Sequence, residues 1–191
     1  MSSLLDSFFP HSQFYEFHSL TIHSSPARVW RALKELTPRE VPVANLLFAI
    51  RALPARFIRG QIPRRFSNEP LLAQVTRASF SILAEEENRE IVLGAIGQFW
   101  RAAGGAWVKP KSAEHFVAFN DASFAKAAMN FRLTALAENK TRLETETRII
   151  CTDDLARKKF WWYWRIISPG SALIRVVWLR AIKTRAEQVA E

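Results

Sequence analysis

The 191-residue chain has a single cysteine, Cys151. One thiol cannot form an internal disulfide, which excludes the class of small secreted domains that depend on disulfides. The first residues, MSSLLDSFFPHSQ, lack a basic stretch followed by an apolar one, so we expect no secretory signal. The most apolar stretch, residues 41–53, contains Arg51 and is too short to span a bilayer. We therefore expect a cytoplasmic protein.

Metal-binding and catalytic signatures are also missing. The sequence contains no P-loop, no G-x-G-x-x-G and no G-x-S-x-G. Cys151 has no neighbour at ligand spacing, and we expect a small buried thiol rather than half of a Cys–His nucleophile. The four histidines, which include His18 and His23 on opposite faces of a predicted strand, do not form a ligand pattern. We therefore expect no metal and no cofactor, and we assign no catalytic residue.

Acidic residues are absent from two stretches of the chain, which has 27 Lys and Arg against 18 Asp and Glu. Residues 41–68 contain five Arg, and residues 155–186 contain eight Lys or Arg. Such a positive field attracts lipid headgroups, nucleic acid or a carboxylate ligand, or it simply keeps a solvated surface soluble. No nucleic-acid-binding motif is recognisable, so we do not expect a nucleic acid partner.

The first predicted strand passes directly into a helix. Residues 16–24 alternate between apolar and polar side chains, as in a strand with one covered face. Ser25 is placed to cap a helix and Pro26 suits its first position, after which apolar residues recur at helical spacing. The sequence T-P-R-E at residues 37–40 forms a capping box, and a second helix is predicted through residues 46–53.

Strands dominate the middle of the chain and helices its end. Alternation and turn residues predict strands over residues 80–85, 90–100, 115–120, 128–137 and 142–152. Asp153 or Asp154 is placed to begin a helix, and Ser168-Pro169 to begin another that runs to about residue 189, roughly 30 Å long. The apolar stripe of that last helix comprises Leu173, Ile174, Val177, Trp178, Ala181 and Ile182.

This order of elements predicts an α+β fold in one domain over residues 1–191, with residues 1–13 as an N-terminal arm. We expect a curved antiparallel sheet of roughly six to seven strands, two short helices after the first strand, and a long C-terminal helix on the covered face. A curved sheet around one helix leaves room for a cavity between them. The outer face of residues 90–100 is also apolar, which leaves a homodimer contact open.

Three segments resemble a known superfamily. Residues 22–30, I-H-S-S-P-A-R-V-W, are similar to the first strand–helix joint of helix-grip proteins. These include START lipid-transfer domains, polyketide cyclases and dehydrases, and the birch-pollen allergen. Residues 145–149, T-E-T-R-I, and residues 163–175, Y-W-R-I-I-S-P-G-S-A-L-I-R, resemble a bacterial branch of unassigned function. The resemblance spans about residues 15–187 and implies a cavity for an apolar small molecule or lipid under the last helix.

The residues predicted to bind that ligand lie on the last strand, on the last helix and among the aromatic residues. Thr145 and Thr147 share the apolar face of their strand, and Arg148 or Arg175 is placed to meet a carboxylate at the cavity mouth. The remaining candidates, which line either a cavity or an ordinary core, are Trp100, Phe119, Phe131, Ile174 and Trp178.

The other face of the last strand carries Glu144, Glu146 and Arg148. These residues form either an acid–base group that opens onto the cavity or ion pairs on a solvated face. The ion pairs are favoured, because the apolar residues of this strand lie on the opposite face.

The leading functional hypothesis is a protein that binds an apolar ligand between sheet and helix. A cyclase, dehydrase or hydrolase acting in the same cavity is the first alternative. A peripheral membrane lipid carrier is the second, because a helical wheel places Trp161 among Arg157, Lys158 and Arg165, as in a membrane-surface helix. Simple stacking of an arginine on an exposed indole would give the same pattern. The expected partner is an apolar small molecule or lipid, with a membrane surface and a homodimer left open.

Overall fold

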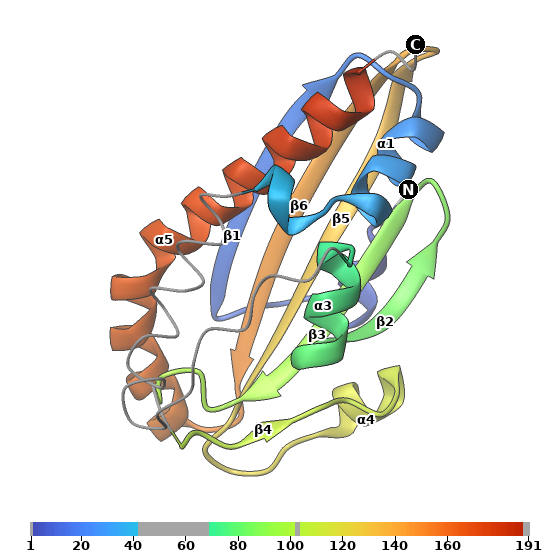
Figure 1. The fold of residues 1–191 in the computed structure, drawn as a ribbon. Helices are drawn as coiled ribbons and strands as arrows, with labels where there is room; N and C mark the ends of the chain where they lie inside the picture. The colour runs from blue at the N-terminus through green and yellow to red at the C-terminus, as the bar shows by residue number, and fades with distance from the viewer. Residues whose placement is uncertain (1, 42–68, 102–103, 189–191) are drawn as a thin grey trace.

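An antiparallel sheet of six strands packs against a long C-terminal helix in this computed structural model, which describes residues 2–41, 69–101 and 104–188 (Figure 1). The strands are β1 (Phe14–Ile22), β2 (Ser81–Glu86), β3 (Glu90–Gly97), β4 (Trp107–Val108), β5 (Ala125–Ala137) and β6 (Lys140–Cys151). The helices are α1 (Pro26–Glu35), α3 (Leu71–Ala78), α4 (Ala113–Ala118) and α5 (Asp154–Glu187), with 3-10 turns η1 (Leu4–Ser7) and η2 (Pro38–Glu40). The predicted α+β helix-grip fold is confirmed.

The strands lie in the order β1–β6–β5–β3–β2, and β4 pairs with the end of β3. Neighbours β2 and β3, like β5 and β6, form hairpins. In the first hairpin Asn88 has a φ of 60°, a left-handed conformation that Asn adopts more readily than most residues. β1 pairs with β6, the last strand of the chain, and this register places Glu16 opposite Thr147.

The joint between β1 and α1 forms where the sequence predicts it. Ser25 is the N-cap residue and Pro26 takes the first helical position, where its missing N–H is not needed. The Ser25 side chain makes no capping hydrogen bond, so that part of the prediction is wrong. Instead, Thr141 Oγ1 of β6 donates to the carbonyl of Ser24 at 2.7 Å, which ties the joint to the sheet.

The second predicted helix start is found at η2. The side chains of Thr37 and Glu40 form the reciprocal capping box that the sequence predicts. The helix predicted over residues 46–53 lies outside the described residues. Helix α3 was not predicted; it begins after Pro70, and the Leu71 N–H donates to the carbonyl of Leu36 at 2.7 Å.

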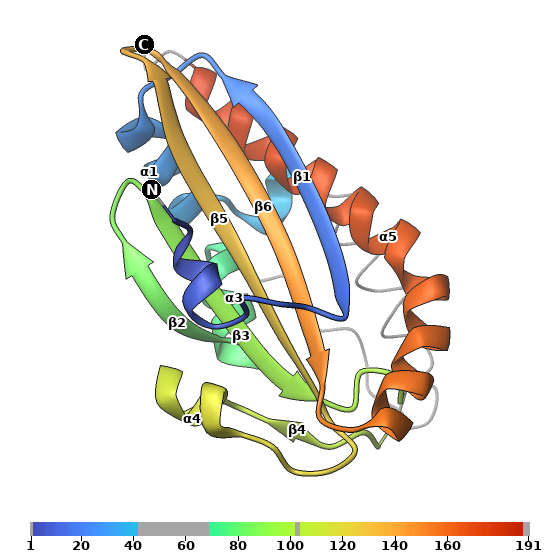
Figure 2. The same ribbon diagram turned by 180° about the vertical axis from the view of Figure 1, so that it is seen from behind.

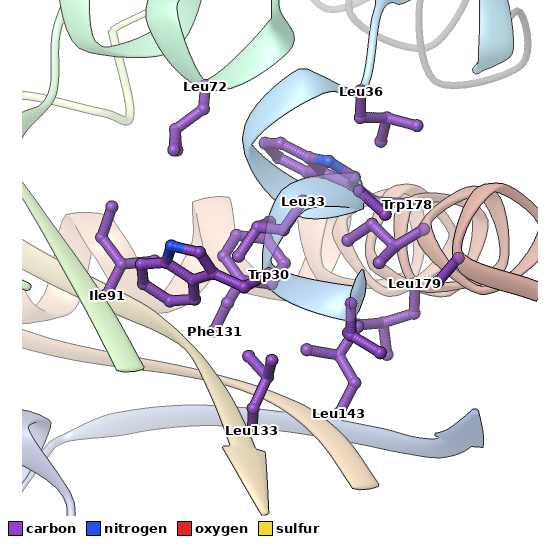
Figure 3. Close-up of a cluster of buried hydrophobic side chains, with 14 of the residues drawn as sticks. Trp30, Leu33, Leu36, Leu72, Ile91, Phe131, Leu133, Leu143, Trp178 and Leu179 are labelled. Atoms are coloured by element: carbon purple, nitrogen blue, oxygen red, sulfur yellow. The ribbon is translucent and has the colours of Figure 1, made fainter. Parts of the chain in front are cut away.

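One face of the sheet packs against α1, α3 and α5 in the larger hydrophobic core (Figure 3). Trp30 and Leu33 of α1 and Trp178 of α5 lie over Phe131 of β5. The rings of Phe131 and Trp178 meet edge to face, with centroids 5.1 Å apart. These contacts hold the C-terminal half of α5 on the sheet.

The opposite face of the sheet is covered by the residues before β1 and by α4 (Figure 2). Leu5 and Phe9 are buried there beside Phe116 of α4, with the two phenylalanine centroids 5.4 Å apart. All eight residues of β3 are buried, because one face meets the larger core and the other meets this cover. The apolar outer face of this strand, which left a homodimer contact open, is therefore occupied by the chain itself.

Glu90, the first residue of β3, is fully buried and ties the N-terminal cover to the sheet. Its Oε1 accepts hydrogen bonds from Ser3 Oγ at 2.5 Å and Asn130 Nδ2 at 2.6 Å, and its Oε2 accepts one from the Leu4 N–H at 2.8 Å. Asn130 Oδ1 in turn accepts the N–H of Glu146 at 2.8 Å. One carboxylate thus connects the cover with β3, β5 and, through Asn130, β6.

The strand predicted over residues 115–120 is wrong, because most of it belongs to helix α4. The Ser112 side chain accepts the N–H of His115 at 3.1 Å and caps this helix. Phe116 and Phe119 then fall on one side of the turn and enter the same hydrophobic cluster. Six residues are too few for periodicity alone to separate a helical turn from a strand.

Helix α5 is continuous over 34 residues, about 51 Å at 1.5 Å per residue. Asp153 caps it by accepting the Ala156 N–H at 2.7 Å. The predicted restart at Ser168-Pro169 is wrong, since Pro169 lies inside the helix. Proline has no N–H to donate to the carbonyl of Arg165, which favours a bend, and α5 bends part way along its length (Figure 2). Packing on both sides of Pro169, at Phe160 and at Trp178, keeps the two halves in one helix.

Candidate functional site

A cavity of about 410 Å³ lies between α5 and the sheet, where the sequence predicts it. Its floor is formed by Ala127 and Met129 of β5 and by Thr147 and Ile149 of β6. One side of α5 forms the opposite wall, with residues three or four positions apart such as Tyr163, Ile167, Ile174 and Trp178. Val75, Ser79, Phe80, Phe99 and Trp107 complete the described lining.

Strand alternation explains why β6 supplies the floor. Leu143, Thr145, Thr147, Ile149 and Cys151 are buried on one face, as the period of two predicts. The remaining face of β6 carries Glu146 and Arg148, which form an ion pair, and Arg148 also pairs with Asp6 at 2.8 Å. The ion pairing predicted for this polar face is found, but the face is not solvated, because the side chains of Glu146 and Arg148 are only 13% and 15% exposed beneath the N-terminal cover.

Phe160 organises the aromatic end of the cavity. It is 2% exposed and its ring lies 4.7 Å from that of Phe14, centroid to centroid. Four further rings surround it at 5.5 to 6.4 Å, those of Tyr163, Trp164, Phe99 and Trp100. This cluster gives the N-terminal half of α5 a second attachment, separate from the larger core.

Arg175 is the only Lys, Arg, Asp or Glu in the described lining. Its Nη2 donates to Thr147 Oγ1 at 3.2 Å, and no carboxylate among the described residues forms an ion pair with it. Burial lowers the pKa of Arg175 to about 10, against the opposing field of Glu16. The guanidinium therefore remains a cation at neutral pH, in an apolar cavity and without a paired anion.

The surrounding sequence offers Arg175 little further compensation. Glu16 on β1 is the one nearby carboxylate that acts on Arg175; its Oε1 contacts His18 Nε2 at 2.9 Å, and its Oε2 is buried without a partner among the described residues. Residues 42–68, which lie outside the described residues, contain no Asp or Glu at all. A bound anion would thus meet little competition for this cation.

Trp178 lines the cavity beside Arg175. Its Nε1–H is buried and has no acceptor among the described residues. Trp178 and Arg175 are three positions apart on α5, which places them side by side on the helix surface. This nitrogen is enclosed by protein and has no surface open to the cavity, so a ligand there would meet the Trp178 ring and not its N–H.

The structure brings together four of the residues predicted from the sequence to bind a ligand. Thr147, Ile174, Arg175 and Trp178 line the cavity. Phe131 lies directly behind Trp178 in the larger core.

The other four predicted residues lie outside the described lining. Trp100 contacts Phe160 from outside the cavity wall, and Thr145 is buried with its Oγ1 donating to the carbonyl of Asn130 at 2.8 Å. Phe119 and Arg148 lie on the opposite face of the sheet, where Arg148 pairs with Glu146 and Asp6.

Sequence reasoning missed the part of the wall that precedes Pro169. Tyr163, Trp164 and Ile167 line the cavity together with Gly170 and Ser171. Their helical spacing is the same as that of Ile174 and Trp178 and continues across Pro169, so the sequence did contain a signal for this part of the wall. The prediction missed it because it assumed that a new helix starts at Ser168.

Cys151 is buried at the end of β6, in the hydrophobic cluster that contains Phe160. Burial raises the pKa of its thiol to about 12, so the reactive thiolate is scarce at neutral pH. Among the residues that the structure describes, no three His, Cys, Asp or Glu side chains gather closely enough to hold a metal ion. None of the described helices has the length and apolarity to cross a membrane.

Gly170 gives a first test of the cavity wall. A Cβ added there would meet no atom of the described residues within 4 Å, whereas one at Gly94 would lie 2.5 Å from Leu83 Cδ1. We expect Gly170→Ala to raise the free energy of unfolding by about 0.5–1 kcal/mol, because alanine loses less backbone entropy in a helix. Gly94→Ala, the matched control, should be neutral or destabilising. Urea unfolding followed by circular dichroism measures both, and a loss of stability in Gly170→Ala would contradict the open space.

The chain matches no protein-family model and no curated protein. Its fold is similar to that of a protein from Mesorhizobium loti, with 13% identity, 93% of this chain and 100% of that chain covered, and a TM-score of 0.42. An aromatase/cyclase from Streptomyces sp. R1128 shows 13% identity, 91% and 93% coverage, and a TM-score of 0.36. Norcoclaurine synthase from Thalictrum flavum shows 7% identity, 91% and 93% coverage, and a TM-score of 0.39. We infer neither ligand nor reaction from structures this distant.

Proposed function

We propose that the protein binds an amphipathic small molecule, with its apolar body in the cavity and an acidic head at Arg175. The observation that carries this proposal is one unpaired guanidinium in an otherwise mostly apolar cavity of about 410 Å³. Ligand sites typically combine such a volume with few polar groups that fix orientation.

Apolar burial would supply most of the affinity. The cavity is walled by aromatic and aliphatic side chains, and burial is worth about 25 cal/mol per Å² of apolar surface. Lost translational and rotational freedom offsets part of this gain, so affinity depends also on how well the head is held.

A carboxylate is the head that suits Arg175 best. Guanidinium binds carboxylate through two parallel hydrogen bonds, and such charge-assisted bonds are stronger than neutral ones. Withdrawing a cation partly from water without a paired anion is unfavourable, so a carboxylate ligand would compensate the charge of Arg175.

The described lining favours binding over acid–base catalysis. It contains no carboxylate, imidazole or thiol, the groups that most often transfer protons or attack as nucleophiles. The alternative is a cyclase, dehydrase or hydrolase that acts in the same cavity. The experiment below separates this enzyme from a binding protein by testing the probe for turnover. We also propose a cytoplasmic location; a single cysteine, which cannot form an internal disulfide, supports it.

Charge selectivity at Arg175 is the decisive test. We expect the protein to bind a fluorescent long-chain fatty acid about 10–100-fold more tightly than its methyl ester, because a hydrogen bond to a charged group is worth about 1.5–3 kcal/mol. Arg175→Met should remove this preference and leave ester binding nearly unchanged. Fluorescence titration measures both affinities.

Two controls complete that experiment. Arg180→Met removes an exposed arginine five residues further along α5 and should keep the preference. Mass spectrometry of the recovered probe tests for turnover, and a chemically altered probe would favour the enzyme alternative. Equal affinity of the wild-type protein for acid and ester would refute the role of Arg175.

A further inference from the structure

The N-terminal half of α5 also presents an apolar stripe to solvent, on the side away from the cavity. The stripe comprises Leu155, Trp162, Ile166 and Leu173, which are 55%, 66%, 80% and 46% exposed. Their spacing of seven, four and seven residues places them on one line along the helix. The line is about 27 Å long at 1.5 Å per residue. The buried residues Phe160 and Trp178 face the protein instead.

Basic side chains flank this stripe. A helical wheel places Lys158 and Arg165 along one side of it and Lys159 along the other. The Arg165 guanidinium lies 4.8 Å from the ring centre of Trp161, and that ring meets Trp162 edge to face at 4.7 Å. Arg157, Lys158 and these two tryptophans border a shallow hollow of about 220 Å³.

We propose that this face of α5 binds the surface of an anionic lipid bilayer. An interfacial helix needs apolar side chains that enter the acyl boundary, tryptophan at headgroup depth, and cations beside them, and the stripe with its flanks provides all three. In the shallow hollow Lys158 is the cation available to a lipid phosphate, because Arg157 Nη2 donates to Asp154 Oδ1 at 3.0 Å. The proposal goes beyond ligand binding in the cavity and does not depend on it.

Charge excludes the main competing occupants of the stripe. Lys158, Lys159 and Arg165 flank the stripe, so a second copy packed on this face would bring like charges together. Residues 41–68, with five Arg and no acid, would do the same. Nucleic acid would satisfy the cations but would leave Leu155, Ile166 and Leu173 in water. An anionic membrane satisfies both the apolar and the charged side chains.

If α5 binds a membrane in this way, its cavity-lining side and its membrane-binding side lie close together. Tyr163, Ile167 and Ser171 line the cavity, while Trp162 and Ile166, their neighbours in sequence, face solvent. A helix with its side chains is only about 10–12 Å across. Docking through the stripe would therefore hold the cavity within about one helix diameter of the lipid headgroups.

Vesicle sedimentation with the full chain tests the proposal. We expect the protein to sediment with phosphatidylcholine vesicles that contain 30% phosphatidylglycerol, as the charge dependence of interfacial binding requires, and hardly at all with pure phosphatidylcholine (roughly a tenfold difference or more). The double variant Trp162→Ser/Ile166→Ser should bind the anionic vesicles at least about tenfold more weakly, because it removes the two most exposed apolar contacts. Lys158→Gln and Arg165→Gln should each cost about fivefold, at low salt.

Three comparisons make the result decisive. Ile82→Ser alters an exposed apolar residue on β2, 45% exposed, and should bind as the wild type does. The stripe variant should keep its affinity for the fatty-acid probe, and Arg175→Met should keep vesicle binding. The two variants therefore test ligand binding in the cavity and membrane binding by the stripe independently. Unchanged vesicle binding by the stripe variant, no binding by the wild type at low salt, or a lipid-free dimer that only the stripe variant loses would each overturn the proposal.

Discussion

Glu90→Ala is expected to lower the free energy of unfolding by about 3–5 kcal/mol, because it leaves several buried donors without their acceptor at about 1–3 kcal/mol each. Ser3 Oγ, the Leu4 N–H and Asn130 Nδ2 all donate to this carboxylate. Asn130 Nδ2 also donates to Ser3 Oγ at 3.2 Å, and this bond survives the substitution, which limits the total loss. The expected effect is large because the site is fully buried, so these donors are out of contact with bulk water.

The same substitution should loosen the N-terminal cover before the sheet itself unfolds. Glu90 is the side chain that joins Ser3 and Leu4 to β3, and Leu5 and Phe9 follow directly in the cover. We expect faster proteolysis within the first residues of Glu90→Ala, together with the loss of stability in urea. Glu87→Ala, in the exposed turn before β3, is the matched control. A change of less than about 1 kcal/mol in Glu90→Ala would show that the network contributes little.

Phe160→Ala is expected to cost about 3–5 kcal/mol, the range for truncating a buried phenylalanine. Five aromatic rings surround Phe160. Tyr163 and Trp164 belong to α5, whereas Phe14 of β1 and Phe99 and Trp100 after β3 attach the N-terminal half of α5 to the sheet. Truncation therefore removes the contacts that hold this half of the helix and enlarges the cavity that it borders. Thermal and urea unfolding measure the loss.

The neighbouring Trp161 supplies the control for this prediction. It is 42% exposed and contacts Trp162 and Arg165 on the solvent side of α5. We expect Trp161→Ala to change stability by no more than about 0.5 kcal/mol, as is usual for surface positions. Equal losses in Phe160→Ala and Trp161→Ala would mean that the aromatic cluster does not hold the helix.

Local periodicity predicted the parts of this fold in which one face is buried and the other is not. β6 is the clearest case, because Thr147 and Ile149 alternate with Glu146 and Arg148 along a strand that is covered on one side. The surroundings of β3 were harder to predict from periodicity, because both of its faces are buried and its sequence does not alternate. The cover on its outer face comes from residues about 85 positions earlier in the chain, which no local pattern can reveal.

The sequence predicted where the candidate site lies, but not all of the residues that line it. The stripe that includes Ile174 and Trp178 placed the cavity under the last helix, and both residues line it. The choice between Arg148 and Arg175 depended on tertiary structure, because each is an arginine beside apolar residues. Asp6, more than 140 residues from Arg148 in sequence, pairs with it on the far face and leaves Arg175 as the cavity cation.

The buried thiol of Cys151 at the end of β6 can report when the aromatic cluster around Phe160 opens. A thiol-specific reagent can modify Cys151 only when the cluster around Phe160 separates, because the closed state hides the sulfur and keeps it protonated. With no second cysteine to react, the labelling rate measures one event at one place. A ligand that keeps the cavity closed would lower the rate at which the reagent labels Cys151. Ligands of unknown identity can therefore be found by screening for compounds that slow this labelling.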